Sequence, residues 1–129
     1  MKVRALDHLV LTVTDRQRSV DFYTRVLGMR AETFGDDRIA LHFGDQKINL
    51  HEADKPIEPH ATHPLPGTAD LCFIVEGRIE NTIDEIQRAG ATCLFGPVDR
   101  TGARGPLRSI YLRDPDGNLI ELASHDLPP

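Results

Sequence analysis

Residues 6–13 read LDHLVLTV, and residues 70–75 read DLCFIV. Apolar and β-branched residues dominate both stretches and, in the first, recur at every second position, which is the pattern of a β-strand. His8 in the first stretch and Asp70 in the second hold the same place, five positions before the last valine. The two stretches therefore predict two strands of the same kind, each opening one half of the chain.

The first half continues with one helix and three short strands. Residues 14–16 offer an N-cap, residues 19–27 carry apolar side chains at helical spacing, and Gly28 provides a C-terminal stop. Turn signals then separate three strand candidates, at residues 29–34, 39–43 and 47–51.

A proline-rich segment, residues 52–67, follows the first half. It contains Pro56, Pro59, Pro64 and Pro66 and shows no periodicity. Proline lacks a backbone donor and breaks both helices and central strands, so this segment is expected to be a linker.

The order of elements then starts again. After the strand at residues 70–75, a helix is expected at 79–89 and a strand at 91–95. A loop rich in glycine and arginine follows at 96–105, and the last two strands are expected at 107–112 and 119–123.

Both halves thus follow the order strand, helix, strand, strand, strand. The sequence predicts one α+β domain over residues 1–129, made of two βαβββ modules at residues 1–52 and 68–125. A unit of this size cannot close its own hydrophobic core, so two copies are expected to pack together.

The repeat makes four polar positions equivalent. Residues 48–50 match residues 120–122, so Asn49 corresponds to Glu121 as His8 corresponds to Asp70. Polar groups inside apolar strands need partners. Four positions related by a duplication could converge on one cavity.

The composition argues against several partners. A net charge of -5 disfavours nucleic acid and anionic membranes. No apolar stretch reaches the roughly 20 residues that span a bilayer, and the first residues lack the apolar core of a signal peptide. Cys72 and Cys93 lie in apolar runs, as reduced core thiols do, so a cytoplasmic location is expected.

Several stretches together resemble one superfamily. Residues 6–13 and residues 19–29, which include SVDFY and VLGM, resemble the opening of vicinal oxygen chelate proteins, the glyoxalase, bleomycin-resistance and extradiol-dioxygenase group. The stretch RDPDGNLIEL at residues 113–122 resembles their closing strand. Residues 43–52 and 96–106 are similar to the subgroup labelled glyoxalase-domain-containing protein five.

The resemblance implies an open, cupped sheet of eight strands with helices on the outside, around a divalent metal that chelates substrate oxygens. It places metal ligation on His8 and Glu121. Asn49 stands where glyoxalase I has a second glutamate, and Asp70 where a second histidine is usual. Asparagine is a weak ligand, so we expect Asn49 to bind substrate and Asp70 or His51 to complete the ligand set. Such a set favours hard ions such as Mn or Mg, with Ni, Zn and Fe left open.

The expected partner is a small molecule, and three functions remain open for the protein. The first is a glyoxalase-like lyase or isomerase for an oxygen-rich substrate, in which the metal stabilises an enediolate and the catalytic Glu121, or Asp70, moves a proton. The second is an extradiol dioxygenase, an oxidoreductase that needs two histidines and one carboxylate around iron, so His51 would have to act. The third is non-catalytic drug binding of the bleomycin-resistance kind.

The arginine-containing segment and the linker give two further expectations. Residues 100–105, the end of the predicted loop, are either a plain hairpin-like connection or a mobile lid in which Arg100 and Arg104 bind an acidic group of the ligand. The linker at 52–67 is long enough for modules to pair within one chain or between two, and either arrangement predicts a homodimer.

Overall fold

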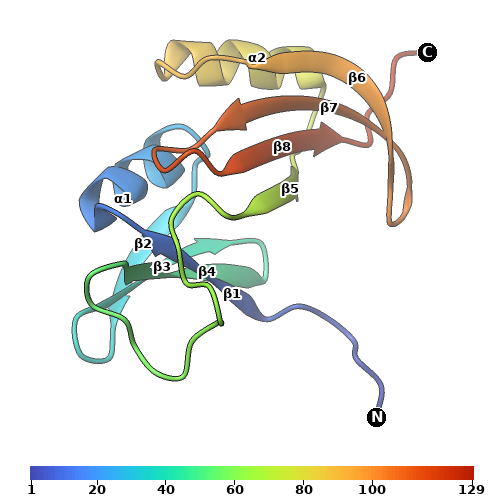
Figure 1. Ribbon diagram of the computed structural model, residues 1–129. Coiled ribbons are helices and arrows are strands. Elements are labelled where there is room, and N and C mark those ends of the chain that lie inside the picture. The colour runs from blue at the N-terminus through green and yellow to red at the C-terminus, as the bar shows by residue number, and fades with distance from the viewer. The chain divides into compact units, whose positions relative to one another are not determined.

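The computed structural model describes all 129 residues of the chain. Two compact units make up the chain, Met1–Gly67 and Thr68–Pro129, which follow the blue-to-red colouring of Figure 1 in that order. Each unit holds one helix and one four-stranded sheet. The predicted α+β class with two βαβββ modules is therefore confirmed, and the eight strands are divided between two sheets.

The first unit has the sheet order β1-β4-β3-β2. Strand β1 runs parallel to β4, and the other neighbours are antiparallel. The bounds of its elements are β1 (His8–Val13), α1 (Arg16–Arg25), β2 (Arg30–Phe34), β3 (Arg38–Phe43) and β4 (Gln46–Glu52).

The helix α1 packs on one face of this sheet. Because side chains alternate along a strand, each strand sends every second residue into this core and the others to the opposite face. Leu11 and Val13 are buried while His8 and Val10 are exposed, so one face of β1 belongs to the core and the other does not. The buried core residues are Leu11, Val13, Phe22, Tyr23, Leu41, Ile48 and Leu50.

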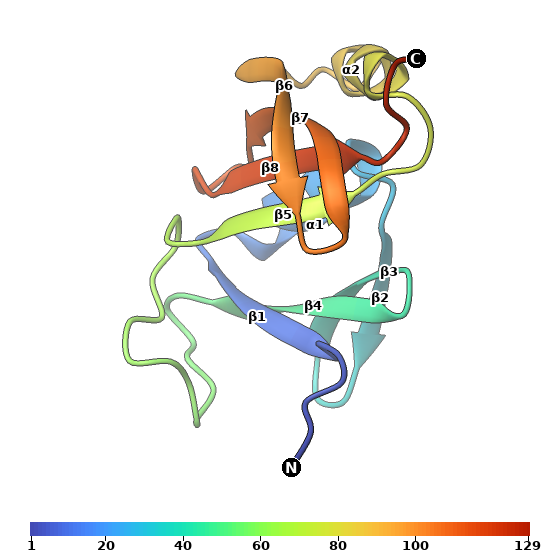
Figure 2. The same cartoon turned by 90° about the vertical axis from the view of Figure 1, so that its right-hand side faces the viewer.

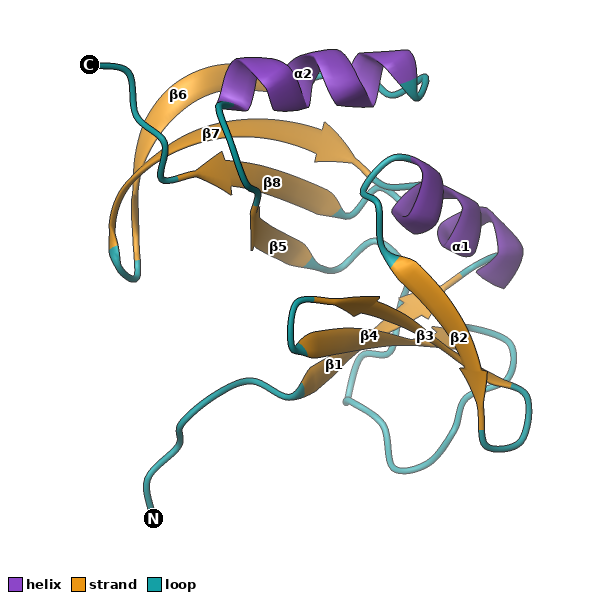
Figure 3. Ribbon diagram, turned by 180° about the vertical axis from the view of Figure 1, so that it is seen from behind, coloured by secondary structure: helices purple, strands orange, loops and turns teal.

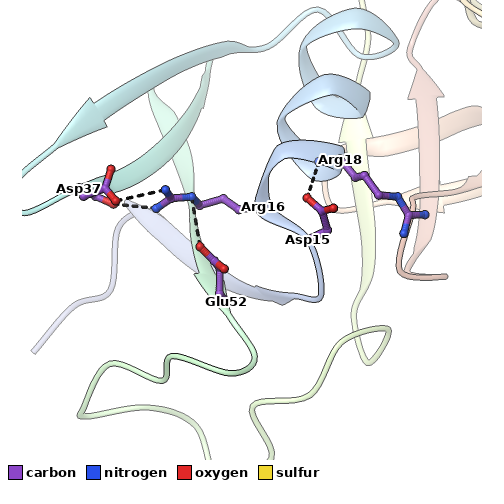
Figure 4. A network of polar contacts seen from close by, with 5 residues as sticks. All are labelled: Asp15, Arg16, Arg18, Asp37 and Glu52. Carbon is purple, nitrogen blue, oxygen red and sulfur yellow. Dashed lines mark hydrogen bonds and ion pairs between the residues drawn. The ribbon is translucent and has the colours of Figure 1, made fainter.

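The start of α1 is fixed by polar contacts of Asp15 and Arg16, drawn in Figure 4. The side chain of Asp15 caps the helix by accepting a hydrogen bond from the backbone N–H of Arg18 at 3.1 Å. Arg16 donates to the backbone oxygen of Asp37 at 2.7 Å and lies 3.4 Å from Glu52. The helix thus begins earlier than expected, at the predicted capping segment, and is tied to the β2–β3 turn and to the end of β4.

The second unit repeats this arrangement with the sheet order β5-β8-β7-β6. The helix α2 lies along one face of the sheet, and an ion pair between its Glu80 and Arg108 of β7 joins the two (Figure 3). Its elements are β5 (Asp70–Ile74), α2 (Ile79–Arg88), β6 (Phe95–Gly102), β7 (Gly105–Arg113) and β8 (Leu119–Ser124). The buried core residues between α2 and this sheet are Ile79, Ile86, Ile110, Leu112, Ile120 and Leu122.

The predicted strand at 91–95 and loop at 96–105 need correction. Residues 91–94 are not a strand, and residues 95–102 form β6, which pairs with β7 in the hairpin visible in Figure 2. Two glycines in β6 allow close packing. A Cβ on Gly96 would lie 2.6 Å from the backbone oxygen of Ser109, and one on Gly102 would lie 2.5 Å from Leu107. Of the two glycines that suggested a mobile lid, Gly102 instead lets the two strands approach each other, whereas Gly105 lies in open space.

The turn between β7 and β8 places the start of β5. The Asp114 carboxylate accepts hydrogen bonds from the backbone of Asp116 and Asn118, both at 2.9 Å. The side chain of Asn118 in turn accepts from the backbone N–H of Ala69 at 2.9 Å. The DPDGN stretch therefore holds the first residue of β5 beside β8, where two of the predicted site residues lie.

Two other expectations have a clear outcome. Residues 53–69, which include most of the predicted linker, contain no helix or strand. Cys72 is exposed and Cys93 half-buried, so the prediction that both are core thiols is wrong, although both are free. Cys72 lies on the strand face turned away from α2, which its apolar neighbours in sequence did not reveal. No helix combines the length and the apolar character that crossing a membrane requires.

Candidate functional site

The equivalence predicted from spacing appears in the strand registers. Val10 pairs with Asn49 across the parallel β1–β4 ladder, and Cys72 pairs with Glu121 across the parallel β5–β8 ladder. His8 lies two residues before Val10 on β1, and Asp70 lies two residues before Cys72 on β5, so each shares a strand face with that residue. Each sheet therefore carries two polar side chains at equivalent positions, His8 and Asn49 in the first unit and Asp70 and Glu121 in the second. We call these the donor side chains, because each has an atom that could donate a lone pair to a metal ion.

The polar face of the first sheet is the one opposite α1. Most of its side chains are ionisable, and two of its polar residues, Asn49 and His51, are buried. In the order of the strands it consists of His8, Val10 and Thr12 of β1, Lys47, Asn49 and His51 of β4, Arg38, Ala40 and His42 of β3, and Arg30, Glu32 and Phe34 of β2.

His8 is oriented by its neighbour in sequence. Its Nδ1 lies 2.8 Å from a carboxylate oxygen of Asp7, and its side chain is 45% exposed. A carboxylate at one ring nitrogen fixes the tautomer with the proton on that nitrogen, which leaves Nε2 as a basic lone pair. This is the arrangement that metal-binding histidines commonly show.

Asn49 is the buried polar residue at the centre of the polar face. It is 4% exposed, and its Oδ1 is buried without a hydrogen-bond partner. Its neighbours across the strands are Val10 on one side and Ala40 on the other, neither of which can donate. An orphan acceptor of this kind costs about 1–3 kcal/mol unless a ligand supplies the missing donor.

His51 is buried beside a cation. It is 7% exposed, and its Nε2 lies 3.3 Å from Nη2 of Arg38, which donates to it. The pKa of His51 is below its ordinary value, first because of burial and then because of the nearby Arg38 and His60. The ring is therefore neutral near pH 7, and the guanidinium at Nε2 makes His51 the least suitable of the predicted metal ligands.

Two cations of the polar face share one aromatic ring. The Arg38 guanidinium lies 4.8 Å and the Lys47 ammonium 4.1 Å from the ring centroid of Phe34. Neither forms an ion pair, and Nε of Arg38 is buried without an acceptor. The one carboxylate of this face, Glu32, is 3.1 Å from Arg30 and 3.4 Å from His42. Contact with Phe34 offsets part of the cost of holding the two cations.

The Glu121 face is the equivalent surface of the second sheet, turned away from α2. It combines two carboxylates with a thiol, a serine hydroxyl, aromatic side chains and two arginines. It consists of Asp70, Cys72 and Ile74 of β5, Leu119, Glu121 and Ala123 of β8, Leu107, Ser109, Tyr111 and Arg113 of β7, and Phe95, Val98 and Arg100 of β6.

Glu121 is held by two neighbouring side chains. The hydroxyl of Ser109, which is fully buried, donates to Oε2 at 2.7 Å. Cys72 is exposed as a residue, but its thiol lies within hydrogen-bonding reach of the carboxylate. Burial of the thiol and the charge of Glu121, in that order, raise the pKa of Cys72 to about 11. The thiol therefore stays protonated and donates, so both contacts fix the carboxylate of Glu121 as an acceptor.

The two predicted substrate-binding arginines have different settings. Arg100 lies on β6, where its Nε donates to the hydroxyl of Tyr111 at 2.9 Å and its guanidinium lies 5.6 Å from the same ring. Together with Leu107 it borders a surface hollow of about 470 Å³. Arg104 is exposed in the turn between β6 and β7. Arg100 alone of the two is anchored on the Glu121 face.

The predicted site residues thus form two pairs of donors, one in each unit. His8 and Asn49 belong to the first unit and Asp70 and Glu121 to the second. No group of three or more His, Cys, Asp or Glu side chains is arranged to hold a metal ion.

Sequence reasoning missed the side chains that support these donors. Ser109 and Cys72 hold Glu121, and Tyr111 anchors Arg100. The alternation along the strand predicted at 107–112 places Ser109 and Tyr111 on one face, which was an available signal. That this face carries Glu121 follows only from the pairing of β7 with β8.

Comparison with known proteins identifies relatives of the whole chain. The sequence model of the Glyoxalase/Bleomycin resistance protein/Dioxygenase superfamily matches residues 5–122. A virulence protein of Salmonella typhimurium is 52% identical over 125 residues, which are 97% of this chain and 87% of that protein. A glyoxalase domain-containing protein of Mycosarcoma maydis is 53% identical over 125 residues, 97% of this chain and 70% of that protein.

Solved structures extend the likeness. An integron cassette protein from the mobile metagenome of V. cholerae is 50% identical with a TM-score of 0.95, covering 98% of each chain. A lactoylglutathione lyase of Agrobacterium tumefaciens is 18% identical with a TM-score of 0.74, over 97% of this chain and 96% of that one. An antibiotic-binding protein of Streptomyces is 20% identical with a TM-score of 0.72, over 96% of this chain and 98% of that one. The last two share the fold.

Proposed function

The chain belongs to the glyoxalase, bleomycin-resistance protein and dioxygenase superfamily, and from this membership we propose that it is a glyoxalase-like, metal-dependent enzyme acting on a small, oxygen-rich molecule. The observation that carries the proposal is the carboxylate of Glu121, held at 2.7 Å by Ser109 at the register position equivalent to Asn49. A carboxylate fixed in this way on a polar strand face is suited to chemistry rather than to packing.

The predicted donor side chains have the ligand chemistry that a divalent ion prefers, although no three of them are arranged around one point. His8 has a free Nε2 because Asp7 engages its other ring nitrogen, and Asp70 is an exposed carboxylate on the same strand face as Cys72. With Glu121 they offer one imidazole and two carboxylates, a set that suits Mn or Mg and is also compatible with Zn, Ni or Fe. When bound, such an ion would stabilise negative charge that develops on a substrate oxygen.

The proposed role of Glu121 follows from its two contacts. Ser109 donates to Oε2, and the protonated Cys72 thiol also donates to the carboxylate. These donors orient the carboxylate so that one oxygen can take a proton from a carbon beside a carbonyl and return it to the adjacent carbon. Asn49, whose Oδ1 lacks a donor, would accept a hydrogen bond from a substrate hydroxyl and so orient the substrate.

The test is turnover by the full chain loaded with Mn²⁺. The probe is the hemithioacetal of glutathione and methylglyoxal, with thioester formation followed by absorbance. We expect turnover that falls at least about a hundredfold in Glu121→Gln, the range seen for loss of a general base. Glu85→Gln, an exposed carboxylate on α2, is the matched control and should leave the rate unchanged. Turnover that survives Glu121→Gln would contradict the proposed role.

Relatives that share the fold point to alternative functions, which further measurements on the same protein distinguish. One is a lactoylglutathione lyase, in line with the proposal, and another is an antibiotic-binding protein. Oxygen consumption with catechol and Fe(II) would favour the dioxygenase function, and tight binding of a small molecule without turnover would favour the binding function. We propose that the protein acts in the cytoplasm as a homodimer.

A further inference from the structure

The polar face of the first sheet is positively charged in a chain whose net charge is -5. Its fixed charges are Arg30, Arg38 and Lys47 against the single carboxylate of Glu32. The local sign is therefore opposite to that of the whole protein, which attracts anions to this surface.

Within this face, Arg38 and Lys47 are the cations that lack a carboxylate. Arg30 pairs with Glu32 at 3.1 Å, whereas Arg38 and Lys47 contact only the Phe34 ring and, for Arg38, the neutral ring of His51. Both are partly buried, and Nε of Arg38 has no acceptor. Partly buried charge without a counter-ion is costly, so an anion at this place would meet two unsatisfied donors.

An unsatisfied acceptor lies on the same strand as Lys47. Asn49 follows Lys47 by two residues on β4, and its Oδ1 is buried without a donor. His51 follows by two more and contacts Arg38, so one cation, Lys47, precedes Asn49 on β4 and a second, Arg38, lies on the neighbouring strand β3. A ligand that satisfies all three needs a negative group and a hydroxyl beside it. A 2-hydroxy acid has both.

We infer that the substrate is an acid whose carboxylate binds Arg38 and Lys47 and whose neighbouring hydroxyl donates to Asn49. The inference rests on the proposed function in taking the polar face as the substrate side, and it narrows the oxygen-rich molecule to a hydroxy acid. It also moves recognition of the acidic group from Arg100 and Arg104, in the second unit, to cations of the first unit.

The test is calorimetric titration of the full chain, in the presence of a chelator, with lactate, acetate and inorganic phosphate. We expect lactate to bind more tightly than acetate and phosphate, because only lactate combines the carboxylate with the hydroxyl. Lys47→Met and Arg38→Gln should each weaken lactate binding by about tenfold to a hundredfold, as loss of a hydrogen bond to a charged group does. Lys47→Arg keeps the charge and should restore most of the affinity.

The matched controls are Arg18→Gln on α1 and Arg88→Gln on α2, two exposed arginines outside the polar face, which should leave lactate binding unchanged. Circular dichroism confirms that each variant is folded. The inference would be overturned if Lys47→Met and Arg38→Gln both bind lactate as tightly as the parent protein. It would also be overturned if phosphate binds more tightly than lactate. Because the titration needs neither metal nor turnover, loss of the proposed enzymatic function would leave this result intact, and failure here would leave the Glu121 assay intact.

Discussion

The thiol of Cys72 reports directly on its contact with Glu121. The structure raises its pKa from 9.0 to about 11, first through burial and then through the charge of Glu121. At pH 8 the thiolate fraction therefore falls from about a tenth to about a thousandth, a loss of about a hundredfold. A more basic thiolate is intrinsically more nucleophilic by roughly tenfold over two pKa units. The net expectation is alkylation about tenfold slower than for an ordinary exposed thiol.

The assay is alkylation by iodoacetamide in a Cys93→Ser background, followed by mass spectrometry between pH 7 and pH 10. The logarithm of the rate should keep rising with unit slope to pH 10 instead of levelling near pH 9. Glu121→Gln removes the charge but not the burial, so it should lower the pKa of Cys72 only part of the way. A plateau near pH 9 in the parent, or a profile indifferent to Glu121→Gln, would refute the geometry described for the Glu121 face.

Three further predictions concern the fold and its assembly. Burial lowers the pKa of His51, so the unfolded chain binds a proton at this residue more readily than the folded chain does. The contribution of His51 to stability is therefore present above pH about 6.5 and is lost as the pH falls below it. In urea unfolding at pH 7, 6 and 5, the free energy of unfolding should decline less in His51→Gln than in the exposed control His63→Gln. Gly96→Ala should lower the free energy of unfolding by more than about 2 kcal/mol, because its Cβ would lie 2.6 Å from a backbone oxygen. Gly105→Ala, also at positive φ but in open space, should lower it by less. Equal losses of stability in thermal unfolding would argue against the close strand packing. Light scattering should give twice the 14.4 kDa mass of one chain, and a monodisperse monomer at micromolar concentration would contradict the expected dimer.

Periodicity was sufficient to predict the two modules and the equivalence of the four polar positions. The spacing of His8 and Asp70 before their strand ends, with the match of Asn49 to Glu121, anticipated the registers observed in both sheets. Those relations depend only on alternation along a strand and on a duplicated order of elements, which a single sequence retains.

The arginine-containing segment shows where such reasoning fails. Gly96 and Gly102 are usual loop signals, but here they are required by contact with β7, a neighbour that the sequence does not name. The supports of Glu121 depend in the same way on register, because Ser109 reaches it only through the pairing of β7 with β8. Arg38 looks like a turn residue, and its contacts with His51 and Phe34 follow from strand pairing alone.

The central claim, that this chain binds a divalent ion through His8 and Glu121, is tested most directly by calorimetric titration of the metal-free full chain with Mn²⁺, followed by Ni²⁺, Zn²⁺ and Fe²⁺. We predict one ion per chain and a loss of affinity of at least about tenfold in both His8→Ala and Glu121→Gln, with His63→Ala unchanged. The absence of tight binding of any of these ions, or equal binding by the parent and both variants, would contradict it.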